Sequence, residues 1–478
     1  MYPHVLYPMT DHFNLVKPHF TPPLDDAFRP AVMANRLFEQ EAAPTGVPLI
    51  FGLERDSGRL SLFEIRVFPE DHPRAASNLF YAERILKFLL WQRGGRRVYV
   101  GGPRSIGEYL QSCYSSGGKR NFDYHFMSEQ VYEEDFRVVP CEPSQVPAEQ
   151  DVGEALGRHL DGCRIGFDLG ASDRKVSAVS DGQVVYSEEV IWEPRKHADP
   201  EYHYREIITA LKTAASKMPR VDASGGSSAG IFIDNRPMVA SLFRSIPPER
   251  FHEIRNLFLR IRDELNVPLV VINDGDVTAL AGSMSLEENG VLGIAMGSSE
   301  AAGYVDVFGR IMGWLNELAF APVDYSPTAP ADEWSGDTGC GSQYFSQQCV
   351  FRLAPRAGIQ IPGGIPDAQK LEFVQEKLYA GHEGAVKIWQ SIGIYLGYAL
   401  AHYASFYDMQ HVLILGRCTS GLGGTLILEE ARKVLEAEVP ELAARLQVQL
   451  PDERSRRVGQ SIAAASLPKV HKSTHEAA

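Results

Sequence analysis

The chain has 478 residues, of which 44% are hydrophobic and 23% are charged, a composition typical of a globular protein with roughly two to four domains. Its formal net charge of −14 argues against nucleic acid or an anionic membrane as the main partner, because both repel an acidic protein. The six cysteines form no Cys-x-x-Cys pair, which argues against a disulfide framework and a thiolate zinc site.

No apolar run reaches the ~18 residues that span a bilayer. The first residues, Met1 to His4, also lack the charged and apolar regions of a secretory signal. The sequence therefore predicts a cytoplasmic protein that binds no membrane.

The first third of the chain divides into two parts. Residues 1–45 are rich in proline and predict an extended arm. Residues 46–160 predict an α/β accessory segment, with a hairpin over 49–68, a helix over 75–92 and a strand over 97–103.

A DNA-binding role for residues 1–150 is disfavoured by charge. This stretch has 16 basic and 19 acidic residues, whereas affinity for DNA comes from neutralising phosphates with an excess of basic ones. The role of the accessory segment is left open. Residues 140–151, with Pro, Ser, Glu and Gln, are the best candidate for a linker.

The next segment predicts a β-hairpin whose turn carries Asp168, Gly170 and Ser172. Such a turn can bring backbone N–H groups and a hydroxyl close to a phosphate, while the carboxylate holds Mg²⁺ through water. Glycine suits this turn because a Cβ would block the approach. An ordinary hairpin turn explains the three residues equally well when they are taken alone.

Further along, helices are predicted over 204–217 and 249–266, followed by a buried strand over 268–274. Ligands of α/β proteins bind at the carboxyl ends of strands, so Asp274 stands where a general base would stand. It can equally be the N-cap of the following helix. Position alone does not separate the two roles.

A second hairpin turn, at Gly297 and Ser298, would let two turns hold one polyphosphate from opposite sides. Asn316 and Glu317 supply an amide and a carboxylate that can both bond sugar hydroxyls. The strand 411–416 ends in Gly416, where the absence of a side chain lets an adenine ring lie against the backbone.

The order of these motifs resembles the ROK family (repressors, uncharacterised proteins and sugar kinases) of the actin, sugar-kinase and Hsp70 superfamily. The resemblance covers about residues 162–467. The motifs are Asp168-Leu169-Gly170-Ala171-Ser172, Ala229-Gly230-Ile231-Phe232-Ile233-Asp234, Val271-Ile272-Asn273-Asp274, Gly297-Ser298, Asn316-Glu317-Leu318 and Leu413-Ile414-Leu415-Gly416.

The resemblance implies an α/β fold of two actin-like (ribonuclease H-like) lobes with a ligand cleft between them. The lobes are expected at 161–285 and 286–467, with a disordered tail at 468–478. The implied cofactors are ATP and Mg²⁺, with Mg²⁺ held through water by Asp168.

The resemblance also implies roles for individual residues. Asp274 resembles the catalytic base, and Gly416 falls in the adenosine motif. The implied phosphate-binding residues are Asp168, Gly170, Ser172, Gly297 and Ser298. The implied sugar ligands are Asn273, Asn316 and Glu317.

Four positions depart from the family pattern. Phe320 replaces a histidine, and the cysteine-rich zinc loop is reduced to Cys340 and its neighbouring glycine, so no structural zinc is expected. Arg417 crowds the base site. Glu300 follows the second phosphate turn, where a carboxylate ~4 Å from a phosphate oxygen would repel it by about 4 kcal/mol at an effective dielectric near 20. The sequence therefore leaves three outcomes open: Glu300 points away from the phosphate, Glu300 binds a metal, or ATP is not held in the usual way.

The sequence thus predicts an enzyme, a sugar kinase that phosphorylates a hydroxyl of a hexose or N-acetylhexosamine with Asp274 as general base. The alternative is a non-catalytic sugar sensor or scaffold that has lost ATP turnover, and a DNA-binding repressor is a distant third. The expected partner is a small-molecule sugar rather than nucleic acid. Whether the chain forms a homodimer stays open.

Overall fold

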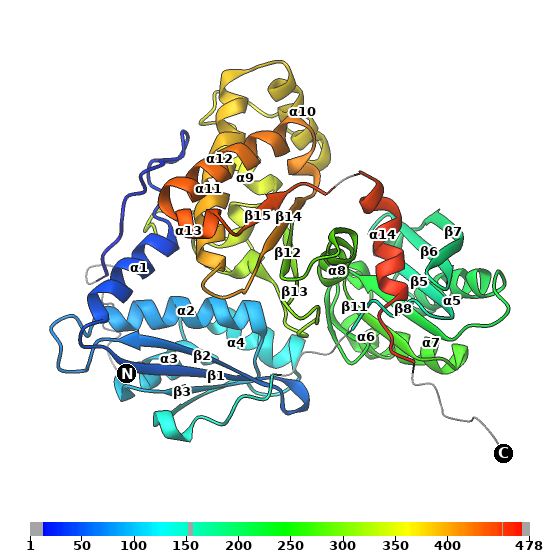
Figure 1. Cartoon of the computed structure of the whole chain (residues 1–478), viewed down its shortest axis with the longest axis horizontal. Coiled ribbons are helices and arrows are strands. Elements are labelled where there is room, and N and C mark those ends of the chain that lie inside the picture. The colour runs from blue at the N-terminus through cyan, green and yellow to red at the C-terminus, as the bar shows by residue number, and fades with distance from the viewer. Residues whose placement is uncertain (1–12, 152–155, 452, 471–478) are drawn as a thin grey trace. The chain divides into compact units, whose positions relative to one another are not determined.

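The structure is a computed structural model that describes residues 13–151, 156–451 and 453–470, with no side-chain description for 453–458 (Figure 1). The chain forms two compact units, each built from several stretches of sequence. Unit 1 holds Met1–Val152, Ile294–Ala302 and Trp314–Leu450, and unit 2 holds Gly153–Gly293, Gly303–Gly313 and Pro451–Ala478. The ends of the expected arm and tail, residues 1–12 and 471–478, lie outside the described residues.

The accessory segment forms a four-stranded sheet in unit 1, in the order β2-β1-β3-β4. The strands are β1 (Val47–Glu54), β2 (Leu60–Val67), β3 (Arg97–Gly101) and β4 (Arg137–Cys141). The predicted hairpin is confirmed, since β1 pairs antiparallel with β2. On its other side β1 pairs antiparallel with β3, and β4 joins β3 in parallel.

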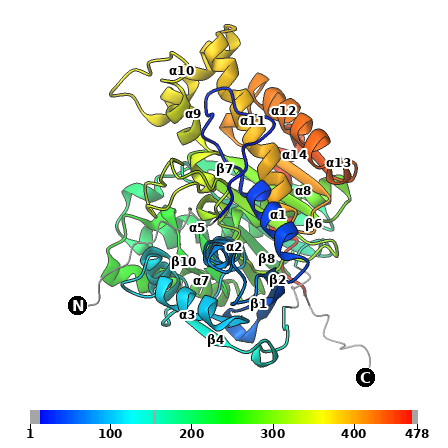
Figure 2. The same ribbon diagram turned by 90° about the vertical axis from the view of Figure 1, so that its left-hand side faces the viewer.

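Helix α2 (Ser77–Arg93) packs on this sheet and is buried along almost its whole length. Figure 2 shows it nearly end-on above β1 and β2. The apolar periodicity predicts one buried face, but Glu83, Arg84 and Lys87 are buried as well. Helix α2 is therefore enclosed, with the sheet on one side and other parts of unit 1 around the rest, among them the short turn η8 (Leu318–Phe320).

The rest of unit 1 is mainly helical. Residues 31–42, expected in an extended arm, instead form helix α1 (Ala31–Ala42), which follows Pro30 and buries Phe38. The long helix α11 (Glu383–Tyr403) is buried and packs against α12 (Leu422–Glu438). Beside them lies a sheet in the order β13-β12-β14-β15, made of β12 (Val291–Met296), β13 (Glu300–Val305), β14 (His411–Leu415) and β15 (Gln447–Gln449). Strands β14 and β15 belong wholly to unit 1, whereas only the halves of β12 and β13 next to their connecting turn do.

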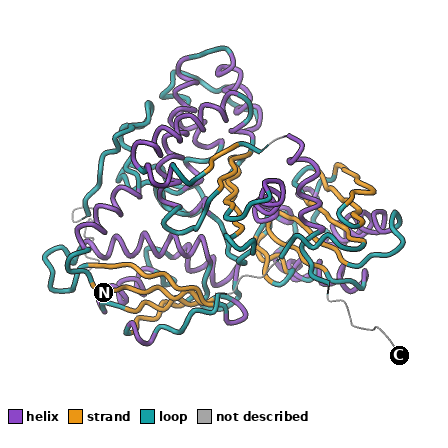
Figure 3. Tube along the Cα trace, in the orientation of Figure 1, coloured by secondary structure: helices purple, strands orange, loops and turns teal. Residues whose placement is uncertain are grey.

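Unit 2 is built on a five-stranded sheet in the order β11-β8-β5-β6-β7 (Figure 3). The strands are β5 (Cys163–Leu169), β6 (Asp173–Ser180), β7 (Gln183–Ile191), β8 (Ala223–Ser228) and β11 (Leu269–Asn273). The first three form an antiparallel meander, while β8 and β11 run parallel to β5. Helix α5 (Pro200–Ala215) and helix α7 (Leu257–Leu265) contribute to its core.

The helix predicted over 249–266 is divided in two. Helix α6 (Phe251–Arg255) ends where Asn256 leaves the helical region, and α7 then continues to Leu265. Asn266 ends α7 in the left-handed conformation, with φ 52°, which asparagine tolerates better than most residues.

The last helix, α14 (Glu453–Ala465), packs on the sheet of unit 2. Two sheet glycines allow this, because a Cβ at Gly166 would collide with the Ser461 carbonyl and one at Gly225 with the Ala464 carbonyl. Residues 451–467, assigned to the second lobe in the sequence-based division, thus belong to the same unit as the sheet of the first. Among the described residues, no helix is long and apolar enough to cross a membrane.

Candidate active site

In unit 2, the first candidate phosphate turn joins β5 to β6. The Gly170 N–H donates to the Asp173 carbonyl over 2.9 Å and closes the turn. Ser172 is exposed at its tip, and its hydroxyl donates to Oδ2 of Asp173 over 3.0 Å. Asp168, near the end of β5, is half-buried, and its Oδ1 accepts from the Ser227 hydroxyl of β8 over 2.7 Å. The predicted hairpin is thus present, with its hydroxyl facing solvent.

The second part of the unit 2 site lies where β11 meets helix α8 (Asp274–Leu286). Asn273 is the N-cap, since its Oδ1 accepts from the Gly275 N–H over 2.6 Å. Its amide nitrogen donates to the Gly230 carbonyl over 2.8 Å. The two roles that position alone left open for Asp274 are therefore separated: the residue before it caps the helix, and Asp274 occupies the first helical position.

Both Asp274 and Asp168 have raised pKa values, and the charge of Asp168 contributes to the rise at Asp274. Burial raises the pKa of Asp274 to about 6, and the negative charge of Asp168 adds to the rise. Burial also raises the pKa of Asp168, against the opposing effect of the hydrogen bond from Ser227. A carboxylate with a pKa near neutrality is suited to general-base catalysis, because it is ionised near neutral pH and still holds a proton well.

Carboxylate oxygens supply the chemistry that a divalent cation requires. Mg²⁺ prefers oxygen ligands and usually keeps several of its waters, so one or two carboxylates are enough to hold it. A cation beside Asp274 would offset the charge of Asp168, the smaller of the two causes that raise the pKa of Asp274. Within the described part of the chain, no three His, Cys, Asp or Glu side chains gather into a metal-binding group.

In unit 1, the second candidate phosphate turn joins β12 to β13. The Gly297 N–H donates to the Ser299 carbonyl over 3.0 Å, and the Gly297 carbonyl accepts from the Gln347 N–H over 2.9 Å. Ser298 and Ser299 are exposed. This turn also presents its hydroxyls to solvent.

Glu300, the residue expected to repel a phosphate, is buried inside unit 1 and is only 3% exposed. Its Oε1 accepts from the Tyr403 hydroxyl over 3.3 Å. Burial raises its pKa to about 8. Of the three outcomes considered for this carboxyl group, the structure supports the first: it points away from the exposed turn, and it is largely neutral at pH 7.

Asn316 and Glu317 are held by the end of helix α2. The Asn316 N–H donates to the Gln92 carbonyl, and the Glu317 N–H donates to the Trp91 carbonyl, each over 2.9 Å. Oδ1 of Asn316 accepts from the Tyr407 hydroxyl over 2.9 Å. Asn316 is buried and has a φ of 50°, whereas Glu317 is half-buried.

Gly416 ends the strand β14 with a φ of 101°, and a Cβ there would collide with the backbone of Met296. Glycine is therefore required by packing inside unit 1 as well as by the expected adenosine motif. Arg417, expected to crowd the base site, is exposed. The candidate residues thus form two groups, five in unit 2 and five in unit 1. They are Asp168, Gly170, Ser172, Asn273 and Asp274 in unit 2, and Gly297, Ser298, Asn316, Glu317 and Gly416 in unit 1.

Sequence reasoning missed Trp91 and Gln92, which contact the Asn316–Glu317 dipeptide. The signal lay in the helix itself, because Glu83, Arg84 and Lys87 place three charged side chains within an otherwise largely apolar helix. A helix with charges among its core positions needs partners for those charges from elsewhere in the chain.

No protein-family model matches the chain, and no curated protein matches it in sequence. Among solved structures, the ROK hexokinase of Thermus thermophilus matches with a TM-score of 0.50 and 18% identity, over 63% of this chain and 97% of that one. A ROK-family glucokinase from Streptomyces griseus, solved with glucose and AMPPNP, has a TM-score of 0.47 and 21% identity, over 64% and 98% of the two chains. A ROK-family transcriptional regulator, a homologue of the E. coli MLC protein, has a TM-score of 0.48 and 17% identity, over 64% of this chain and 78% of that one.

The hexokinase match establishes the fold, and the predicted α/β class with two actin-like lobes is confirmed. More than a third of this chain lies outside the match.

Proposed function

We propose that this protein is a cytoplasmic sugar kinase of the ROK family, which transfers the γ-phosphoryl group of ATP to a hydroxyl of a hexose or an N-acetylhexosamine. One observation carries the proposal: on an actin-like fold, Asp274 directly follows a parallel strand, and its pKa is raised to about 6 by burial and by the charge of Asp168.

In this proposal Asp274 accepts the proton of the attacking hydroxyl. Asp168 holds Mg²⁺ through water, and the ion, when bound, supplies positive charge that offsets the charge on the phosphates. The two hairpin turns and the strand end bind the nucleotide through Gly170, Ser172, Gly297, Ser298 and Gly416. The sugar hydroxyls bond to Asn273, Asn316 and Glu317.

The polar contacts of Asn273 are compatible with a sugar-binding role. Its Oδ1 caps helix α8 and one N–H donates to Gly230, so the side chain is fixed in place by two hydrogen bonds. The amide nitrogen carries a second N–H that can donate to a sugar oxygen. A side chain that is already held in place loses little conformational entropy when the sugar binds.

The burial of Glu300 removes one objection to nucleotide binding. A carboxylate directed at the second phosphate turn would repel the nucleotide, but this side chain bonds to Tyr403 and has a pKa of about 8. The turn at Gly297 and Ser298 is left with two serine hydroxyls and backbone groups, which suit an anion.

The test is ADP release in the presence of Mg²⁺-ATP and a panel of hexoses and N-acetylhexosamines. We expect sugar-dependent turnover in the wild type and a loss of roughly 10²–10⁴-fold in kcat for Asp274→Asn, the usual contribution of a general base. Asp276→Asn is the matched control, because this residue lies on the same helix turn, accepts from the Tyr304 N–H, and has no proposed part in catalysis.

Two other outcomes would contradict the proposal. If calorimetry detects sugar binding while no nucleotide binds, the protein is a sugar sensor or scaffold. A gel shift that weakens with salt would instead indicate a DNA-binding protein.

A further inference from the structure

Two carbonyl groups in the last turn of helix α2 accept hydrogen bonds from residues that lie much later in the sequence of unit 1. The final carbonyl groups of any α-helix lack partners within the helix. In α2, the Trp91 and Gln92 carbonyls accept from the Glu317 and Asn316 N–H groups. The dipeptide proposed to bind the sugar is therefore also the hydrogen-bonding cap of a helix in the accessory segment.

Aromatic packing fixes the same contact. The Trp91 ring lies 4.3 Å from the Phe320 ring, measured between centroids, three residues after Glu317. Trp91, Phe122, Phe126, Phe320 and Trp334 form one aromatic cluster. Phe320 stands where the family pattern has a histidine, and here it joins residues 316–320 to the accessory segment.

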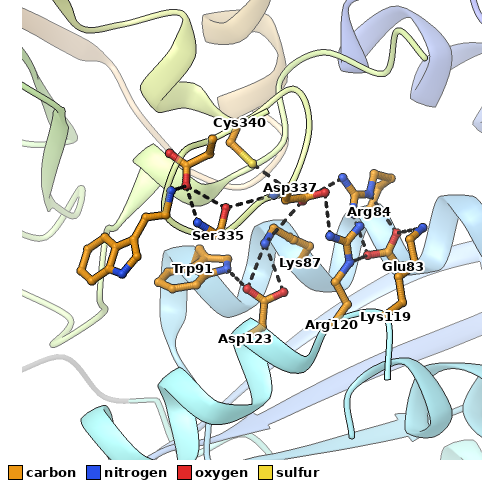
Figure 4. A network of polar contacts seen from close by, with 12 residues as sticks. Glu83, Arg84, Lys87, Trp91, Lys119, Arg120, Asp123, Ser335, Asp337 and Cys340 are labelled. Carbon is orange, nitrogen blue, oxygen red and sulfur yellow. Dashed lines mark hydrogen bonds and ion pairs between the residues drawn. The ribbon is translucent and has the colours of Figure 1, made fainter. Parts of the chain in front are cut away.

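A buried network of charges holds α2 in register (Figure 4). Lys87 bonds to both oxygens of Asp123, over 2.9 and 3.1 Å, and Asp123 also accepts from the Trp91 indole over 2.8 Å. Lys87 and Asp123 are each 1% exposed. Because an unpaired buried charge is costly, this pairing restricts α2 to one position along its axis.

The network reaches the loop that follows the dipeptide. Asp337 pairs with Arg84 over 3.2 Å, with Arg120 over 2.7 Å and with Lys87 over 3.4 Å. Cys340 donates to the same carboxylate through Sγ over 3.7 Å. Figure 4 shows Asp337 between the cationic groups of the accessory segment and Cys340. Both ends of the segment from 316 to 340 are thus attached to α2 and its neighbours.

Gln92 forms a second connection at the dipeptide itself. Its side-chain amide donates to the Phe406 carbonyl over 2.9 Å, next to Tyr407, whose hydroxyl donates to Asn316. Gln92 therefore accepts a hydrogen bond from the Asn316 backbone and donates one to Phe406, the neighbour of the tyrosine that bonds to the Asn316 side chain.

We propose that the end of helix α2 is the positioning element for the Asn316–Glu317 dipeptide, so that the accessory segment determines where the sugar-binding groups of unit 1 lie. Trp91, Gln92 and Tyr407 are positioning residues, which act on the sugar only through Asn316 and Glu317. This inference rests on the proposed sugar kinase activity, and it assigns a role to the segment that sequence analysis left without one.

The test uses Gln92→Met, which removes the bond to Phe406, and Tyr407→Phe, which removes the bond to Asn316. Tyr395→Phe is the matched control, because it removes a buried tyrosine hydrogen bond, to Asp25 over 2.7 Å, that has no link to the dipeptide. Three quantities are measured for each full-length variant. They are the hydrogen exchange of a peptide covering residues 314–320, the KM for the sugar, and kcat.

We expect the amides of Asn316 and Glu317 to exchange faster in both positioning variants, by roughly two- to tenfold, the loss that one hydrogen bond accounts for. The KM for the sugar should rise by a similar factor while kcat changes little. Tyr395→Phe should leave the exchange, the KM and kcat unchanged.

Unchanged exchange in both positioning variants would overturn the inference, as would faster exchange with an unchanged KM. A wild type without sugar-dependent turnover would refute the proposed function. The exchange measurement would still decide whether α2 holds the dipeptide.

Discussion

The Tyr403 hydroxyl donates a hydrogen bond to Oε1 of Glu300 over 3.3 Å inside unit 1. Burial raises the pKa of Glu300 to about 8, and the negative charge of Glu317 adds to the rise, while the bond from Tyr403 opposes it. The carboxyl group is therefore protonated over most of the range in which proteins are handled. Its protonation links the stability of unit 1 to pH.

The first prediction concerns Glu300→Gln. An unfolded chain releases the Glu300 proton near pH 4.5, whereas the folded chain keeps it to about pH 8. The free energy of unfolding of the wild type therefore falls as the pH rises from about 4.5 to about 8. The glutamine variant has no carboxyl group at this position and does not show this decrease. We expect the variant to be more stable by about 3 kcal/mol at pH 7 in urea unfolding.

Glu372→Gln, on the exposed surface of α10 (Asp367–Tyr379), serves as the control and should follow the wild type. A wild type and a Glu300→Gln variant whose difference in unfolding free energy is the same at pH 5 and pH 8 would contradict the assignment.

The second prediction concerns Gly341, which faces the same carboxyl group. A Cβ at this position would collide with Oε2 of Glu300 and would lie 2.6 Å from the Leu318 carbonyl. We expect Gly341→Ala to lower the unfolding free energy by about 1–3 kcal/mol, the usual cost of overpacking a core. Gly363→Ala, where a Cβ would meet no atom within 4 Å, should be close to neutral. The pair is compared by thermal unfolding, and equal midpoints would count against this packing.

The third prediction is the pH dependence of catalysis. Asp274 must be ionised to accept a proton, and its pKa of about 6 is raised by burial and then by Asp168. We expect kcat/KM to fall as the pH drops through about 6. Carboxyl resonances followed by NMR should show a lower pKa for Asp274 in Asp168→Asn, because the charge of Asp168 is gone. An unchanged Asp274 titration in that variant would refute the coupling.

The fourth prediction concerns the charge network at α2. Burial alone would raise the pKa of Asp337, but Arg84 and Lys87 outweigh it and hold the pKa at about 2. This ion pairing stabilises the fold above pH 3.8 and is lost as the pH falls towards 2. We expect Asp337→Asn to lower the free energy of unfolding by about 2–3 kcal/mol at pH 7, as the shift of its pKa from 3.8 to about 2 implies, because three buried cations lose one of their carboxylate partners.

Asp367→Asn is the control for this variant, since its partner Lys370 lies on the surface and such pairs contribute about 0–1 kcal/mol. The two variants are compared by urea unfolding at pH 7 and at pH 3. The defect of Asp337→Asn should be smaller at pH 3, and a defect of equal size at both values would argue against an electrostatic origin.

Local sequence patterns were sufficient to predict many of the strands and helices of unit 2. The two apolar runs on either side of the turn at Gly170 and Ser172 predict a hairpin, and the apolar run before Asn273 predicts a strand with polar groups at its end. These patterns left Asp274 as either a general base or the N-cap of the next helix, whereas the N-cap is Asn273. Both residue types cap helices, and helix starts are uncertain by one or two residues until the backbone is known.

Long-range contacts account for what the sequence left unresolved. The direction of Glu300 depends on Tyr403, far along the chain, and the burial of Lys87 depends on Asp123 and Asp337. These pairings have no periodicity in sequence. The function of α2 was hidden for the same reason, because Asn316 and Glu317 reach it only in the folded unit.

Helix α14 seats against Gly166 and Gly225, yet the ribosome makes residues 453–465 long after the sheet that they cover. During most of synthesis the sheet of unit 2 lacks this helix, and a sheet whose hydrophobic surface is exposed is prone to aggregation. We therefore expect cellular yield to depend on chaperones that shield the growing chain, and stalled translation before the final helix to give insoluble protein rather than a partly active one.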